Sequence, residues 1–125
     1  MHKQQKAGER RRFRRFRVFG GLFSVIRSDS GKIIGDLTDI SSGGMAFLSD
    51  PDEHAMSEFS TIDLFQIPGG VCLNNIPLRH VSTTAGYFEI NRHKMKMVRN
   101  SFDFKTLDPH QKKELGTFIR NYARI

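Results

Sequence analysis

Residues 32–48 read KIIGDLTDISSGGMAFL, and this stretch holds the pattern that decides the fold. Two apolar runs rich in β-branched and aromatic residues flank Ser42-Gly43-Gly44, which tolerates turn geometry. The pattern predicts two antiparallel strands, Lys32–Ile40 and Met45–Leu48, joined by a short connection.

The same pattern continues on both sides of this stretch. Short apolar runs alternate with turn residues at roughly ten-residue spacing, as in an antiparallel β domain. The further expected strands, which bring the total to six, are Phe16–Arg27, Thr61–Ile67, Val71–Val81 and Tyr87–Phe104. Turn residues at 68–70, 83–86 and 91–93 separate or break these runs, and Asn74-Asn75-Ile76-Pro77 predicts that its strand is interrupted by a bulge or starts late.

The period of the pattern changes near the end of the chain. Asp108-Pro109 supplies an N-cap and a proline at the first helical position. Apolar residues then follow at the spacing of one helix face: Leu115, Phe118, Ile119 and Tyr122. We therefore expect an amphipathic helix over about residues 108–124, with its apolar face against the β body.

The charge of the chain is concentrated at its N-terminal end. The 125 residues suit one domain with one core, and their formal net charge is +7. Residues 1–17 hold eight basic residues and one acidic residue, whereas residues 18–125 hold twelve of each. We expect a flexible basic arm, residues 1–17, followed by a neutral body, and the asymmetry indicates an anionic partner for the arm.

Arginine supplies six of the eight basic residues of the arm, in a stretch that reads ERRRFRRFRV over residues 9–18. Guanidinium groups bond phosphate bidentately and match the O6 and N7 acceptors of guanine. The arm is therefore suited to a guanine nucleotide. A solvated basic tail that contacts RNA, DNA or acidic lipid without specificity is the alternative.

A complementary motif, Asp39-Ile40-Ser41-Ser42-Gly43-Gly44, lies between the two strands of the opening stretch. A carboxylate accepts hydrogen bonds from the N1–H and N2–H₂ groups of guanine, a hydroxyl bonds phosphate or a base edge, and glycines permit a close approach. A plain turn in which Asp39 and Ser41 bond neighbouring backbone groups is the alternative.

The two motifs together resemble the double signature of the PilZ domain family. Arg11-x-x-x-Arg15 precedes Asp39-x-Ser41-x-x-Gly44 by some two dozen residues, and the resemblance covers nearly the whole chain. It implies a six-stranded antiparallel β-barrel with a C-terminal helix and no catalytic activity. It also implies that the ligand is the bacterial second messenger cyclic di-GMP, and that the arm is mobile until it wraps over this ligand.

The resemblance also implies roles for individual residues. Arg11 and Arg15 match the arginines that grip guanine edges and phosphates, and Asp39 and Ser41 match the turn residues that bond the second guanine. Gly44 matches the closing glycine, with Gly43 beside it. Arg10 resembles the residue of members that take two intercalated ligand molecules, whereas Arg14 departs from the short residue often found at its position. The expected ligand-binding residues are Arg10, Arg11, Arg15, Asp39, Ser41, Gly43 and Gly44.

Other chemistries have little support in the sequence. The five histidines have no paired spacing and there is one cysteine, Cys72, so neither a metal site nor a disulfide within the chain is expected. No stretch reaches the roughly 18 apolar residues of a membrane span, and a cytoplasmic location is expected. No strand–elbow–helix motif of a hydrolase and no phosphate loop is present.

We expect a receptor whose arm orders on ligand binding and signals to an unidentified downstream protein in motility, biofilm or exopolysaccharide regulation. Two alternatives remain. One is a β-barrel that binds nucleic acid through its basic arm, a reading that Asp39 disfavours because a carboxylate repels phosphate. The other is a PilZ-like protein-interaction module without a ligand.

Overall fold

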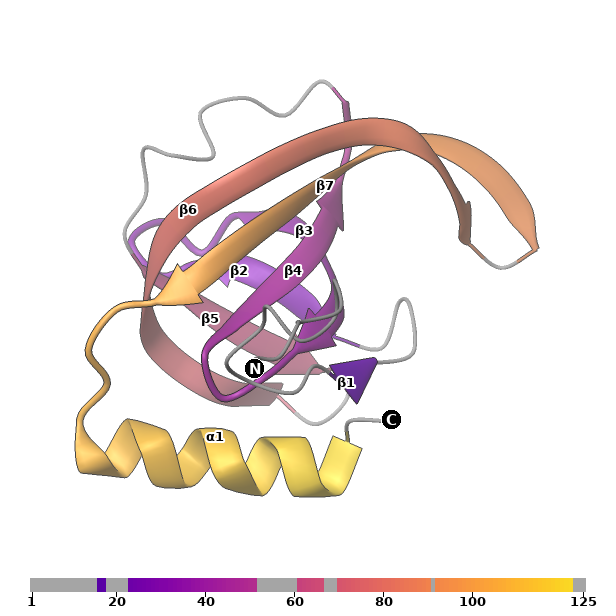
Figure 1. Cartoon of the computed structure of the whole chain (residues 1–125). Helices are drawn as coiled ribbons and strands as arrows, with labels where there is room; N and C mark the ends of the chain where they lie inside the picture. Colours follow the sequence, from indigo (N-terminus) through magenta and orange to yellow (C-terminus); the bar gives the residue numbers. More distant parts are fainter. Residues whose placement is uncertain (1–15, 18–22, 52–60, 67–69, 91, 123–125) are drawn as a thin grey trace, which may run out of the picture.

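The computed structural model of the chain describes residues 16–17, 23–51, 61–66, 70–90 and 92–122, and these residues form seven strands and one helix (Figure 1). In chain order the elements are β1 (Phe16–Arg17), β2 (Ser24–Arg27), β3 (Ile33–Ile40), β4 (Gly44–Ser49), β5 (Thr61–Gln66), β6 (Gly70–Ile90), β7 (His93–Phe104) and α1 (Pro109–Tyr122).

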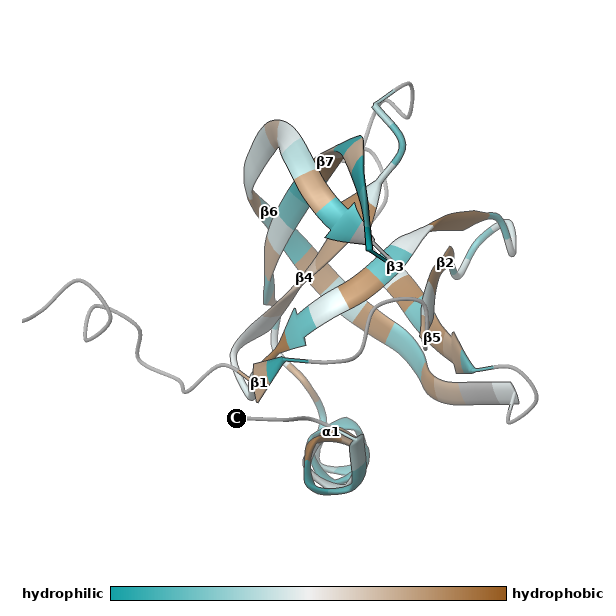
Figure 2. Ribbon diagram, turned by 90° about the vertical axis from the view of Figure 1, so that its right-hand side faces the viewer, coloured by the Kyte–Doolittle hydropathy of each residue, from teal (hydrophilic) through white to brown (hydrophobic). Residues whose placement is uncertain are grey.

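The sheet closes on itself through β3. The strand order is β1-β3-β2-β5-β6-β7-β4, with an additional pairing between β3 and β4, and every pairing is antiparallel. Strands β2 to β7 therefore form a ring of six, and β1 extends the β3 edge that also bonds β2 (Figure 2). This arrangement confirms the predicted antiparallel β fold with a C-terminal helix.

Side chains from alternate positions of the strands fill the barrel. Phe23, Leu37, Phe47 and Leu64 are fully buried, and the rings of Phe47 and Phe102 stack at 5.4 Å between centroids. Burying one such side chain contributes about 1.5–3 kcal/mol. The interior is thus a packed core rather than a channel.

Helix α1 lies across one end of the barrel, as Figure 2 shows with the helix seen end-on. Its apolar face buries Leu115 and Phe118, and the Phe118 ring meets the Phe23 ring at 4.8 Å in an edge-on contact. This packing places the predicted apolar face of the helix against the core.

The start of α1 is capped as the sequence predicts. The backbone N–H of Gln111 donates to Asp108 Oδ1 at 2.7 Å, and the Asp108 N–H donates to Gln111 Oε1 at 2.9 Å. This is a reciprocal capping box.

The bulge predicted near Asn75 lies against the start of the helix, because Gln111 Nε2 also donates to the Asn75 carbonyl at 3.0 Å. Asn75 has a φ of 53° beside a register shift in β6, so the predicted bulge is confirmed and contacts the helix.

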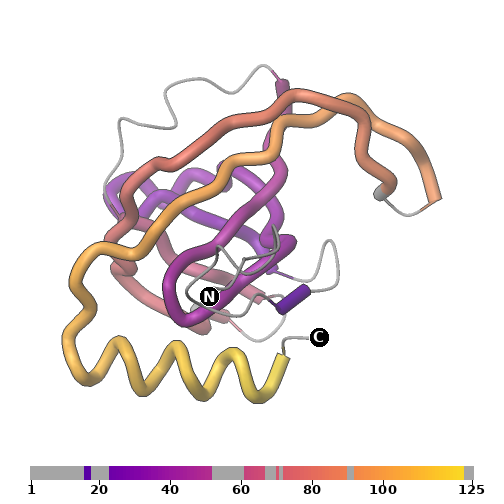
Figure 3. The backbone as a smooth tube through the Cα atoms, in the orientation of Figure 1, coloured from indigo at the N-terminus to yellow at the C-terminus, as the bar shows by residue number. Residues whose placement is uncertain are grey.

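Two of the predicted strand boundaries are wrong. Residues 83–86 are not a separator, because β6 continues through them and pairs with β7 as far as Ile90 (Figure 3). A register shift between His80 and Ser82 precedes Thr83, whose hydroxyl lies 3.3 Å from Asn100 Oδ1 across the pair. The local turn signal is therefore overridden by cross-strand pairing.

The predicted strand Phe16–Arg27 is in fact two strands, β1 and β2. Between Arg17 and Ser24 the chain advances seven residues, whereas their partners Asp39 and Asp36 on β3 are only three residues apart. The two pairings cannot belong to one continuous strand. In the predicted turn at residues 68–70, Gly70 begins β6, whereas residues 68 and 69 and most of the arm lie outside the described residues.

Gly35 on β3 is predicted to be essential for the packing of the barrel. A Cβ added there would overlap the Leu48 carbonyl oxygen and the Phe47 ring. We expect Gly35→Ala to lower the free energy of unfolding by about 1–3 kcal/mol, measured by urea denaturation. Gly86→Ala is the control, because its Cβ would make only ordinary contact with Phe88. Equal stability of the two variants would contradict this account of Gly35.

Candidate functional site

The turn between β3 and β4 is organised by the hydroxyl of Ser41. Ser41 Oγ accepts hydrogen bonds from the backbone N–H groups of Gly43 and Gly44, each at 3.1 Å, and donates to the Gly44 carbonyl at 3.3 Å. The Ser41 backbone N–H donates to the same carbonyl at 2.9 Å. The side chain is 5% exposed, so these bonds satisfy a buried polar group.

Gly44 is required by the packing of β4 on β7. A Cβ at this position would overlap the Phe102 carbonyl oxygen, and the neighbouring Gly43 carbonyl accepts a hydrogen bond from the Phe104 N–H at 2.9 Å. The packing of the fold therefore explains by itself why this position is a glycine. Its predicted role beside a ligand stays a prediction.

Asp39 forms an ion pair with Arg99 of β7. Arg99 Nη2 lies 2.5 Å from Asp39 Oδ2, and the two side chains are 29% and 20% exposed. The Thr38 hydroxyl also donates to Oδ2 at 3.3 Å. Among the residues that the structure describes, Asp39 Oδ1 has no hydrogen-bond partner, so this oxygen remains available as an acceptor.

Sequence reasoning missed Arg99, which lies sixty positions after Asp39. The strand register brings them together: Asp39 pairs with Ala46, and Ala46 pairs with Ser101, two residues from Arg99 on the same face of β7. Arg99 Nη1 donates to Ser101 Oγ at 3.2 Å, which holds the guanidinium along this face.

The end of the basic arm also meets Asp39. In the pairing of β1 with β3, Arg17 lies directly opposite Asp39 and Phe16 opposite Ile40. The predicted ligand-binding residues Arg10, Arg11 and Arg15 lie outside the described residues. Because Arg15 directly precedes Phe16 in the sequence, β1 brings this end of the arm to the turn motif.

A pocket of about 640 Å³ lies on the helix side of the same turn. Its lining is mainly apolar, with two lysines among the polar groups, and includes Ser42, Gly43, Phe104, Leu107, Lys105 and Lys112. This volume is in the range of small-molecule sites. The turn thus separates the Asp39–Arg99 pair on the barrel surface from an apolar pocket beside α1.

Other titratable groups lie away from this site or are engaged elsewhere. Burial raises the pKa of the Cys72 thiol, which disfavours the reactive thiolate, and burial raises the pKa of Asp36. Arg79 pairs with Asp103 at 3.0 Å on the surface. Within the described ranges there is no group of three metal-ligating side chains and no helix long and apolar enough to cross a membrane.

Ser41 is predicted to stabilise the turn measurably. Ser41→Ala removes the acceptor of two backbone N–H groups, so we expect the free energy of unfolding to fall by about 1–3 kcal/mol in urea denaturation. The exposed neighbour supplies a matched control, since Ser42→Ala should change stability by no more than about 0.5 kcal/mol. A loss of the same size in both variants would argue against this role for the Ser41 hydroxyl.

Comparison with known proteins finds similarity in structure. No protein-family model and no curated sequence matches the chain. The PilZ domain of YcgR from Escherichia coli, determined with cyclic di-GMP, is 21% identical, covers 89% of this chain and 89% of its own, and has a TM-score of 0.68.

MrkH of K. pneumonia in complex with cyclic di-GMP is 18% identical, with a TM-score of 0.67, and apo MrkH is 15% identical, with a TM-score of 0.64. Each alignment covers 94% of this chain but only 52% and 50% of MrkH, so the chain spans about half the length of that protein. At these identities the similarity establishes the fold, and the fold of this chain is PilZ-like.

Proposed function

We propose that this protein is a receptor for cyclic di-GMP that binds the ligand between its arginine-rich arm and the Asp39–Gly44 turn. The observation that carries the proposal is the pairing of Arg17 with Asp39, which joins the two motifs within a PilZ-like fold. Solved structures with the same fold were determined with cyclic di-GMP, which supports this choice of ligand.

The chemistry of Asp39 fits one edge of a guanine base. The Arg99 guanidinium engages Oδ2 and holds the carboxylate in place, while Oδ1 has no partner among the described residues. Oδ1 can accept from the N1–H or N2–H₂ group of guanine without displacing Arg99. We infer that Arg99 is a positioning residue for Asp39.

Ser41 and Asp39 then act in different ways. The Ser41 hydroxyl is already engaged by Gly43 and Gly44, so we infer that it shapes the turn rather than bonding the ligand directly. Gly43 and Gly44 keep the turn close to β7, and we infer that the arm meets the ligand on the surface beside Asp39.

Arg10, Arg11 and Arg15 supply the cationic half of the proposed site. Their guanidinium groups match the O6 and N7 acceptors of guanine and the ligand phosphates. Ligand contacts from both arm and turn would order the arm, and a downstream protein would bind the new surface. The protein in this proposal is an adaptor rather than an enzyme, it acts in the cytoplasm, and the ligand needs no metal.

We expect isothermal titration calorimetry to detect binding of cyclic di-GMP in the micromolar range or tighter, with no heat from GTP. Arg11→Ala, Arg15→Ala and Asp39→Ala each remove charge-assisted hydrogen bonds, so each should weaken binding on the order of 10- to 100-fold.

Arg120→Ala is the control for these substitutions, because Arg120 lies exposed on α1 and its described bond is to Thr117 of the same helix. This variant should bind as the unmodified protein does. Absence of heat with cyclic di-GMP, or an equal loss in Arg120→Ala, would overturn the proposed site.

The number of bound ligands is a separate prediction. If Arg10 stacks on the guanine of a second, intercalated molecule, the unmodified protein should bind two ligands and Arg10→Ala should bind one. The titration endpoint measures this ratio directly. A ratio of one in the unmodified protein would remove this role for Arg10 while leaving the receptor proposal intact.

A further inference from the structure

The hairpin formed by β6 and β7 extends well beyond the barrel. Pairing of β4 with β7 ends at Val98 and pairing of β5 with β6 ends at Pro77, whereas β6 and β7 remain paired out to Ile90 and His93. We call residues 86–90 and 92–97 the distal hairpin. At about 3.3 Å per residue each strand runs roughly 20 Å along its length beyond the residues paired with β4. Figures 1 and 3 show the hairpin curving as it leaves the barrel.

One face of the distal hairpin is apolar. Phe88 pairs with Met95 and Gly86 with Met97, and residues that pair directly lie on the same face of a sheet. Phe88 lies against Gly86, whose added Cβ would be 3.7 Å from the Phe88 ring. Met95 is nevertheless 46% exposed, and among the described strands neither β4 nor β5 pairs with this part of the hairpin.

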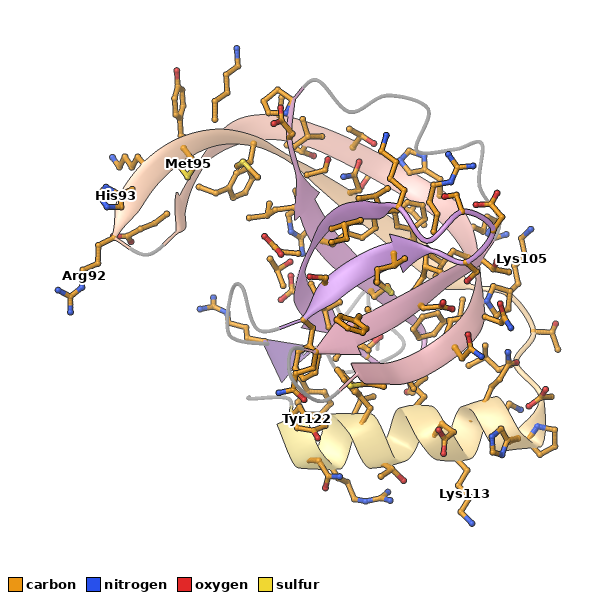
Figure 4. The ribbon with its side chains drawn as sticks, turned by 180° about the vertical axis from the view of Figure 1, so that it is seen from behind. Arg92, His93, Met95, Lys105, Lys113 and Tyr122 are labelled. Atoms are coloured by element: carbon orange, nitrogen blue, oxygen red, sulfur yellow. The ribbon has the colours of Figure 1, made fainter. Side chains whose placement is uncertain are left out.

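The rest of the distal hairpin is cationic and amphipathic. Lys94 and Lys96 lie on the opposite face with Glu89 and with Tyr87, which is 73% exposed. Arg92 lies at the outer end of the hairpin with His93, far from the barrel in Figure 4. Among the described residues none of the three cations forms an ion pair, so their charges face solvent.

We propose that the distal hairpin binds the surface of an anionic lipid bilayer. The hairpin enters the head-group region edge-on by its outer end, so that Met95 on one face and Tyr87 on the other both reach the boundary with the acyl chains, while Arg92, Lys94 and Lys96 attract anionic head groups. Figures 1 and 4 show the outer end of the hairpin clear of the barrel, so this end is accessible to a planar surface.

Other partners use only part of this surface. A second copy of the chain would bring like charges together, and three apolar side chains offer far less than the roughly 800 Å² per partner of a stable interface. Duplex DNA would engage the cations but would leave Phe88, Met95 and Met97 without an apolar environment. The surface of an anionic bilayer accommodates both the cations and the apolar side chains.

Co-flotation of the full chain with vesicles tests this proposal. We expect binding to vesicles of equal parts phosphatidylcholine and phosphatidylglycerol, and none to phosphatidylcholine alone. The charge-reversal variant Lys94→Glu/Lys96→Glu should reduce the partition coefficient on the order of 30-fold or more. Tyr87→Ser/Met95→Ser should reduce it at least about tenfold, since both side chains are exposed and their loss leaves the fold intact.

Matched changes elsewhere on the protein serve as controls. Lys112→Glu/Lys113→Glu alters the net charge by the same amount on α1, and Ile33→Ser/Val81→Ser removes two exposed apolar side chains outside the distal hairpin. Both should bind vesicles like the unmodified protein. The arm is identical in all four variants. If the arm alone bound the vesicles, the four variants would therefore have the same partition coefficient.

Three results would overturn the proposal. They are absence of binding to anionic vesicles, equal losses in the test and control variants, and binding of duplex DNA that Lys94→Glu/Lys96→Glu abolishes while vesicle binding is unchanged. The last result would assign the distal hairpin to nucleic acid.

Discussion

Strand β3 bonds to β1 and β2 along one edge and to β4 along the other, and this double pairing closes the barrel. The turn that follows β3 must reverse the chain tightly enough for β4 to reach β7. Ser41 holds that turn, and Gly44 permits the approach to Phe102. The residues of the proposed ligand site are therefore also residues on which closure depends, and substitutions there act on stability as well as on binding.

Elements with a local signal were predictable from the sequence. The strands on both sides of Ser42, the bulge at Asn75 and the cap at Asp108 each depend on residues within a few positions of one another. The continuation of β6 was not predictable in this way. Thr83 belongs to a run of turn-forming residues, but its partner Asn100 is 17 positions away, and that pairing outweighs the local preference.

The same distinction applies to the candidate site. Asp39 and Ser41 were found because the motif is short, and the Ser41 bonds are those of the plain turn that the sequence left open as an alternative. Arg99 was missed because its approach to Asp39 depends on the register of two successive strand pairings. The spacing of residues in the sequence does not encode that contact. The strand pairings of the closed barrel bring the two side chains together.

Strand β7 connects the two surfaces to which functions are proposed. Arg99, Met97 and Met95 lie on one face of this strand, since alternate residues point the same way, so the Asp39 partner and the apolar face of the distal hairpin share a single strand. The arm and the distal hairpin are both cationic, but the carboxylate that faces the end of the arm, Asp39, is held by Arg99, whereas Glu89 of the distal hairpin lies directly opposite Lys94. Asp39 is therefore placed to accept hydrogen bonds from one guanine base of a small ligand, whereas the cations of the distal hairpin outnumber Glu89 and suit an extended anionic surface.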